Sequence, residues 1–142
     1  MTESLPLALK KDLRDNEENL KKHLQEIKNI TGVEFTMEVS PSMGEINNKI
    51  DGSYKNRLGE IVYNSLMGEV AALFKKNSAD SMVKDALIEA TSAKKIIFEM
   101  TDSANSYHEI AFSNGSLVIK FKPQNIWTNI SDIGYFDVVP LL

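Results

Sequence analysis

Apolar and polar positions between residues 94 and 122, together with the turn signal at Asn114-Gly115, predict three antiparallel strands. The strands cover Lys95–Met100, Tyr107–Ser113 and Ser116–Phe121. Asn114-Gly115 joins the last two, because a two-residue type I′ turn needs positive φ at both central positions and this pair tolerates it. Counting outward from the turn pairs Ser113 with Ser116, Phe112 with Leu117, Ala111 with Val118, Ile110 with Ile119, Glu109 with Lys120 and His108 with Phe121.

Residues 6–30 have the spacing of an amphipathic helix that ends at Gly32. Its apolar positions form one narrow stripe, which Asn16 and His23 interrupt. Two arrangements are consistent with this stripe. It packs against the sheet of the same chain, or it pairs with a second copy in a dimer with Asn16 and His23 near the seam. We favour the monomer. The stripe consists of Leu9, Leu13, Leu20, Leu24, Ile27 and Ile30.

The next part of the chain predicts one strand and a long loop. Val33–Val39 alternates like a strand with one solvent-exposed face. Residues 42–56 are rich in polar and small side chains, and they form a loop with a short element near residues 45–50. Loops of this length are uncommon in compact domains and are often functional.

Two helices follow the loop. The first covers residues 57–76, where Gly59 and Gly68 indicate that another backbone passes close by, because glycine is otherwise unfavourable inside a helix. Asn77 or Ser78 caps the second helix, which extends to residue 91. Its apolar stripe consists of Met82, Val83, Ala86, Leu87 and Ala90.

The predicted order of elements is α-β-α-α-β-β-β, followed by a tail over residues 124–142. Strands joined by short turns and segregated from helices are typical of an α+β domain, which we expect to span residues 1–142. The first strand adds to one edge of the three-strand meander. The result is an antiparallel sheet of about four strands, covered by helices on one face.

Composition limits the chemistry and the partners. The chain has 142 residues and no cysteine, which excludes disulfides, thiolate metal sites and cysteine nucleophiles. With 16 basic and 20 acidic residues the net charge is −4, so nucleic acid is disfavoured and a basic protein surface is the better match. We expect a cytoplasmic protein without membrane contact, because the sequence has no signal-peptide pattern and no apolar run approaching the ~20 residues of a membrane helix.

The sequence contains no motif of a known catalytic, cofactor or metal site, and we expect no cofactor. Residues 52–57 place small and basic side chains before a helix N-terminus, where either solvent or a bound anion is possible. His108 has two interpretations. It is a histidine at the sheet margin with one ring nitrogen hydrogen-bonded, or it is a general base or ligand contact in a cleft between sheet and helices.

The tail supplies the remaining candidate residues, Trp127, Tyr135 and Phe136. Aromatic side chains are enriched at the centres of protein interfaces, but they are also ordinary core residues, and both uses remain open. We expect a non-enzymatic protein–protein interaction domain that binds a protein partner, with Trp127, Tyr135, Phe136 and His108 as candidate binding residues. The alternative is a small-molecule-binding protein or an enzyme of unfamiliar type, with a pocket near His108.

Overall fold

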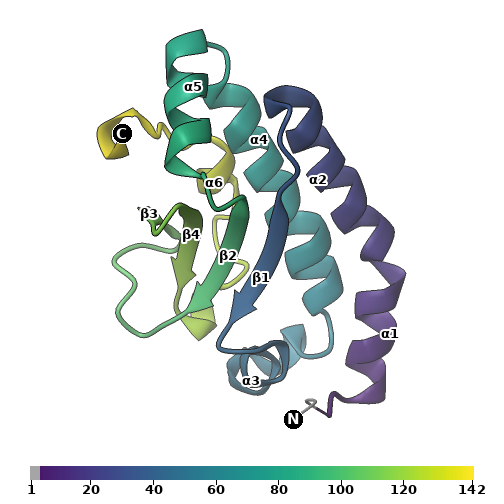
Figure 1. Ribbon diagram of the computed structural model, residues 1–142. Helices are drawn as coiled ribbons and strands as arrows, with labels where there is room; N and C mark the ends of the chain where they lie inside the picture. The colour runs from purple at the N-terminus through teal and green to yellow at the C-terminus, as the bar shows by residue number, and fades with distance from the viewer. Residues whose placement is uncertain (1–3) are drawn as a thin grey trace.

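The computed structural model describes residues 4–142 as a four-stranded sheet beside a set of helices (Figure 1). The chain is α+β, as predicted. The strands are β1 (Thr36–Ser40), β2 (Lys95–Met100), β3 (Glu109–Ser113) and β4 (Ser116–Phe121). The α-helices are α1 (Leu7–Asp15), α2 (Glu17–Thr31), α3 (Met43–Lys49), α4 (Met67–Asn77), α5 (Ser81–Ala90) and α6 (Ser131–Gly134). A π-helix, η2 (Gly59–Leu66), runs directly into α4, and the short 3₁₀ turns are η1 (Gly52–Tyr54), η3 (Pro123–Asn125) and η4 (Val139–Leu141).

The sheet is mixed, so the prediction of an antiparallel sheet is wrong. The strand order is β1-β2-β4-β3, in which β2 is parallel to both of its neighbours and only β3 and β4 are antiparallel. Residues 101–108 carry the chain from the end of β2 to β3 at the sheet edge, and β4 then inserts between them. The physical reason is burial. Leu117, Ile119 and Phe121 of β4 are completely buried, and a central strand with two neighbours buries such residues better than an edge strand does.

The β3–β4 hairpin confirms the register predicted from the sequence. All five predicted pairs from Ser113–Ser116 to Glu109–Lys120 are observed, and Asn114 and Gly115 both have positive φ, at 51° and 78°. The His108–Phe121 pair lies just beyond the ladder, with ring centroids 6.4 Å apart. Turn chemistry and side-chain alternation therefore act together here, as expected for a tight hairpin.

The N-terminal helix is interrupted at Asn16, where the backbone leaves helical geometry between α1 and α2. Gly32 ends α2 in the left-handed conformation, as predicted. The predicted loop over residues 42–56 contains α3, whose first turn is capped by the Ser42 hydroxyl, which accepts from the Glu45 amide at 3.2 Å. The cap of α5 was predicted wrongly. It is Asp80, whose carboxylate accepts from the amides of residues 82 and 83.

The core is one cluster of buried apolar residues that come from both the helices and the sheet. Figure 1 shows α2 and α4 side by side, with α4 passing behind β1. Ile27 of α2 is fully buried, and Phe74 of α4 packs on Phe35 with ring centroids 5.1 Å apart. The apolar stripe of the N-terminal helices therefore packs within the chain, but mainly on η2 and α4 and not on the sheet as predicted; Leu9 and Ile27 are fully buried, and the other four residues of the stripe are partly buried. The sheet residues of the same core are Ile96, Phe98, Met100, Ile110, Leu117, Ile119 and Phe121.

Candidate functional site

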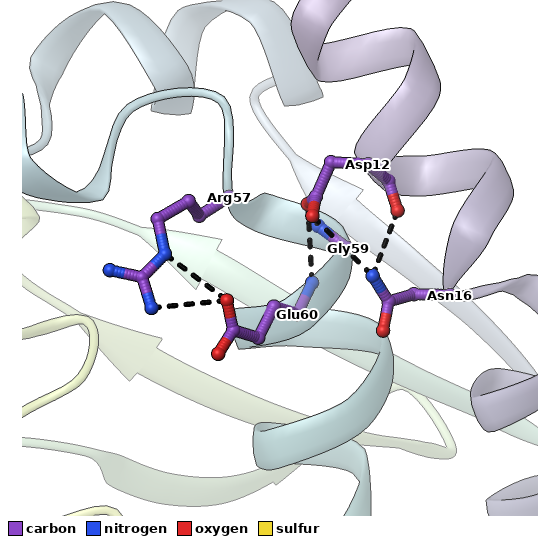
Figure 2. Close-up of polar contacts among 5 residues, drawn as sticks. All are labelled: Asp12, Asn16, Arg57, Gly59 and Glu60. Atoms are coloured by element: carbon purple, nitrogen blue, oxygen red, sulfur yellow. Dashed lines mark hydrogen bonds and ion pairs between the residues drawn. The ribbon is translucent and has the colours of Figure 1, made fainter.

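The start of η2 is capped by a carboxylate from a distant part of the chain. Asp12 of α1 accepts hydrogen bonds at one oxygen, Oδ2, from the backbone amides of Gly59 at 2.6 Å and Glu60 at 3.2 Å (Figure 2). The first amides of a helix have no partner within the helix and carry the positive end of its dipole, so a carboxylate there is favourable. The sequence left open whether an anion binds before this helix. The anion at this helix start is the protein's own Asp12.

Gly59 allows the two helices to approach this closely. A Cβ atom at residue 59 would lie 2.3 Å from the Asp12 carbonyl oxygen, a separation that real Cβ atoms do not adopt. The prediction of a close backbone is therefore confirmed at Gly59. At Gly68 the nearby group is the His23 ring, a side chain, whose nearest atom would lie 3.3 Å from an added Cβ.

The two polar residues that interrupt the N-terminal stripe both have partners within the chain. The Asn16 amide donates to the Asp12 carbonyl at 2.9 Å, which secures the break between α1 and α2 (Figure 2). His23 Nε2 lies 3.2 Å from the side-chain oxygen Oδ1 of Asn64 in η2, which accepts a hydrogen bond from this nitrogen. These contacts support the interpretation in which the stripe packs on its own chain.

Arg57 lies just before the start of η2, and its side chain contacts both Glu60 of η2 and Trp127 of the tail. Its guanidinium donates to Glu60 Oε2 from Nε at 3.1 Å, and Nη2 lies 3.0 Å from the same oxygen (Figure 2). The guanidinium carbon also lies 4.8 Å from the centroid of the Trp127 ring, within cation–π range. Tyr54 meets the same indole edge-on, with centroids 5.6 Å apart. We call Tyr54, Arg57 and Trp127 the Trp127 cluster.

A hollow of about 400 Å³ lies beside the Trp127 cluster and shares Tyr54 with it. One wall is the loop between α3 and η2, and the other is the η3 turn that follows β4. The hollow is mostly polar, and both an ammonium and a carboxylate lie on its walls. Its lining residues are Lys49, Ile50, Asp51, Ser53, Tyr54, Pro123 and Gln124. The loop that the sequence marked as possibly functional therefore forms one side of this site.

The three aromatic candidates of the tail do not form one patch. Trp127 is half-buried beside the start of η2, whereas the backbone of Phe136 is bonded at the opposite end of the same helical run. There the Asn77 amide donates to the Phe136 carbonyl at 2.9 Å, and its Oδ1 accepts from the Val138 amide at 3.0 Å. Tyr135 is 75% exposed. Most of the tail is therefore tied to its own chain.

His108 is at the base of the hairpin and only 7% exposed. Its Nε2 donates to the Ile126 carbonyl at 2.9 Å. Burial lowers the pKa of His108, while the bond to Ile126 and the charge of Asp132 act in the opposite direction. These contacts support the interpretation of a sheet-margin histidine with one bonded nitrogen. A hollow of about 350 Å³ nearby is lined by its neighbour Tyr107 together with Lys122, and His108 is not part of its lining.

Sequence reasoning missed Asp12, Arg57 and Asn77 as organising residues. Asp12 carried a weak signal, because it lies beside Leu13 and one helical turn before Asn16, among positions that face the core. The sequence predicts Asn77 only as a possible helix cap, although the side-chain amide of a buried asparagine can also donate to and accept from the backbone of a distant segment. Arg57 had no local signal, since its partner Trp127 lies far along the sequence.

Within residues 4–142, no three His, Asp or Glu side chains gather closely enough to hold a metal ion. In the same part of the chain, no helix has both the length and the apolar character needed to cross a membrane. Comparison with known proteins gives no further constraint: no family pattern, characterised protein or solved structure matches this chain.

Proposed function

We propose that this chain binds a protein partner, and that the Trp127 cluster is the centre of the contact. The observation that carries the proposal is the half-buried indole of Trp127 held between Tyr54 and the Arg57 guanidinium. Tryptophan, tyrosine and arginine are the residues most enriched where interface energy concentrates. Here all three meet at one surface, beside a hollow that can take a partner side chain.

The cluster is held in place before any partner arrives. Glu60 holds the guanidinium of Arg57 through two nitrogens, and Asp12 caps the start of η2, where Glu60 lies. Side chains that are already ordered lose little conformational entropy on binding, which raises affinity without adding contacts. Arg57 and Glu60 remain more than two-fifths exposed, so a partner can reach them.

The sheet, the compartment and the net charge complete the proposed function. We infer that the helices cover the sheet face that carries the buried Ile96 and Phe98, whereas Lys95 on the opposite face is exposed. The chain acts in the cytoplasm as a non-enzymatic binding domain. Its net charge of −4 favours a partner with a basic surface.

The only tryptophan in the chain makes a direct test possible. A partner isolated from native lysate with the purified chain should change Trp127 emission on titration, because binding alters the surroundings of the indole. Arg57→Ala should weaken that binding by about tenfold or more, which is the usual size of an interface hot spot. Lys75→Ala on the exposed side of α4 also removes one positive charge, and as the control it should bind like the parent.

A partner that binds Arg57→Ala and the parent equally, with no change in Trp127 emission, would exclude the cluster as the contact centre. The melting temperature of Arg57→Ala must be measured in parallel, so that loss of folding is separated from loss of binding.

The hollow beside His108 supports a second candidate function, the binding of a small anion. Tyr107 and Lys122 line it, together with Asn105, Ser106 and Asn125, so hydrogen-bond donors and one positive charge surround the same space. Inorganic phosphate titrated against isotope-labelled protein should shift the amide signals of residues 104–107, and Lys122→Met should abolish the shifts. Unchanged signals at these residues would exclude this function for phosphate-like anions.

A further inference from the structure

The outward side of α5 carries a large exposed apolar side chain where the sequence predicts part of a buried stripe. Met82 is 80% exposed, and only Leu87 of the predicted stripe is buried. Ala86 and Ala90 follow Met82 at intervals of four residues and therefore lie on the same side of the helix. The chain's last residues, Leu141 and Leu142, lie next to them, and Figure 1 shows the C-terminus beside α5.

These residues enclose a hollow of about 420 Å³, lined by Ala86, Glu89, Ala90, Leu141 and Leu142. We call Met82 together with these five residues the α5 surface. It is an ordered part of the fold. Val138, directly before the exposed end, is completely buried and hydrogen-bonded to Asn77, and the Leu141 amide donates to the Val138 carbonyl at 2.9 Å.

The charges on this side of α5 all have one sign. Asp85 and Glu89 follow Met82 by three and seven residues, so their carboxylates project from the same side of the helix. Neither carboxylate forms an ion pair with any residue between 4 and 142. Lys84 is the one basic residue of α5, and its position two residues after Met82 places it on the opposite side. A hollow lined by alanine and leucine side chains and by Glu89, with the Asp85 carboxylate on the same side of the helix, is therefore complementary to a segment that carries both apolar and basic side chains.

We propose that the α5 surface is a second docking site, which binds a basic amphipathic segment of a partner protein. Apolar side chains of the segment enter the hollow, and its lysines or arginines pair with Asp85 and Glu89. A second copy of this chain is a poor occupant. In a two-fold interface each copy contributes the same patch, and the four carboxylates would meet without a cation on this side of the helix. The proposal does not depend on the Trp127 cluster.

The test uses two synthetic fluorescent peptides with one helical pattern of leucines, one carrying lysines and the other glutamates. Fluorescence anisotropy at about 0.15 M salt should show binding of the lysine peptide and none of the glutamate peptide. Glu89→Lys should weaken binding by about tenfold or more, because it converts an attractive pair into a repulsive one. Glu18→Lys changes the net charge equally on α2, where the carboxylate is 87% exposed, and should change binding by less than about twofold.

Met82→Ser is the second variant and tests the apolar contact. Because Met82 is exposed, the melting temperature of this variant should match that of the parent protein. Met82→Ser should also weaken binding of the lysine peptide, whereas Arg57→Ala should leave that binding unchanged. Three results would overturn the proposal: equal weakening by Glu89→Lys and Glu18→Lys, equal binding of both peptides, or no binding of the lysine peptide to the parent. A dimer in light scattering that Met82→Ser converts to a monomer would replace the basic partner by a second copy.

Discussion

The β3–β4 hairpin and the junction between α1 and η2 both depend on a glycine, but for opposite reasons. In the hairpin, Gly115 supplies a backbone torsion of 78° that side-chain-bearing residues rarely adopt. At the junction, Gly59 supplies space, because the Asp12 carbonyl occupies the place of a Cβ. The hairpin joins neighbours in sequence, whereas the junction joins residues 47 positions apart. Local torsion fixes one region, and long-range packing fixes the other.

The largest expected effect comes from filling the space at the junction. Gly59→Ala should lower the free energy of unfolding by about 3 kcal/mol, because the backbone of α1 must move away from the added methyl group. Gly52→Ala is the matched control, since no atom lies within 4 Å of the added Cβ. Urea denaturation of both variants would measure the difference. Equal midpoints for Gly59→Ala and Gly52→Ala would show that the close approach is absent in solution.

The hairpin should be somewhat less sensitive than the junction. Gly115→Val should lower the free energy of unfolding by about 2 kcal/mol, because a β-branched residue is strained at this torsion. Gly32→Val shares the positive torsion, at 76°, but meets no atom within 4 Å, whereas the Ser92 hydroxyl lies 2.9 Å from a Cβ at residue 115. The Gly115 variant should therefore be the less stable one in urea. The reverse order would mean that torsion alone determines the cost at both turns.

Removing the Asp12 carboxylate should lower the free energy of unfolding by less than Gly59→Ala does. Asp12→Ala should lower the free energy of unfolding by about 1 kcal/mol, the usual value for a helix cap, because the amides of Gly59 and Glu60 lose their acceptor. Asp12→Asn retains a side-chain oxygen and should lose less. Thermal melts of the three proteins would rank them. A melting temperature for Asp12→Ala equal to the parent's would show that water replaces the carboxylate without loss.

The smallest expected change in stability concerns His108 at the base of the hairpin, whose ring bonds to Ile126 outside the hairpin. Burial lowers the pKa of His108, so the folded protein takes up a proton at lower pH than the unfolded chain, whose histidine titrates near pH 6.5. Between these two pKa values the unfolded chain binds more protons, and stability therefore falls as the pH is lowered below about 6.5. His108→Gln keeps a donor for the Ile126 carbonyl and should reduce this fall. Urea midpoints for both proteins at several pH values would measure it, and parallel pH profiles would assign the acid sensitivity to other groups.

The same contrast explains how much of the fold the sequence could predict. Asn114-Gly115 determines its hairpin through torsions that two residues carry, so the register followed by counting. The parallel pairing of β2 with β4 has no such local signal. Consecutive strands usually pair, which favoured a meander, and the near-continuous apolar run Leu117-Val118-Ile119 was the available indication of a central strand.

The candidate site was predictable to a similar degree. Trp127 is a candidate from the sequence because aromatic side chains are enriched at protein interfaces, and Gly59 correctly indicated a close neighbour. Arg57 and Asp12 became part of the site only through contacts that folding creates across long stretches of sequence. The π-helical geometry of η2 also has no distinguishing sequence pattern, because its apolar spacing fits an α-helix equally well.

The cap that Asp12 provides determines which segments must be kept together when the Trp127 cluster is transferred to another protein or studied in a fragment. A designer who transplants Tyr54, Arg57 and Trp127 onto another scaffold would carry over the aromatic surface without the carboxylate that holds its helix start. The minimal transferable unit therefore spans three separate segments of chain, around residues 12, 54–60 and 127. A fragment that begins after α2 would contain every residue of the cluster and still lack its support.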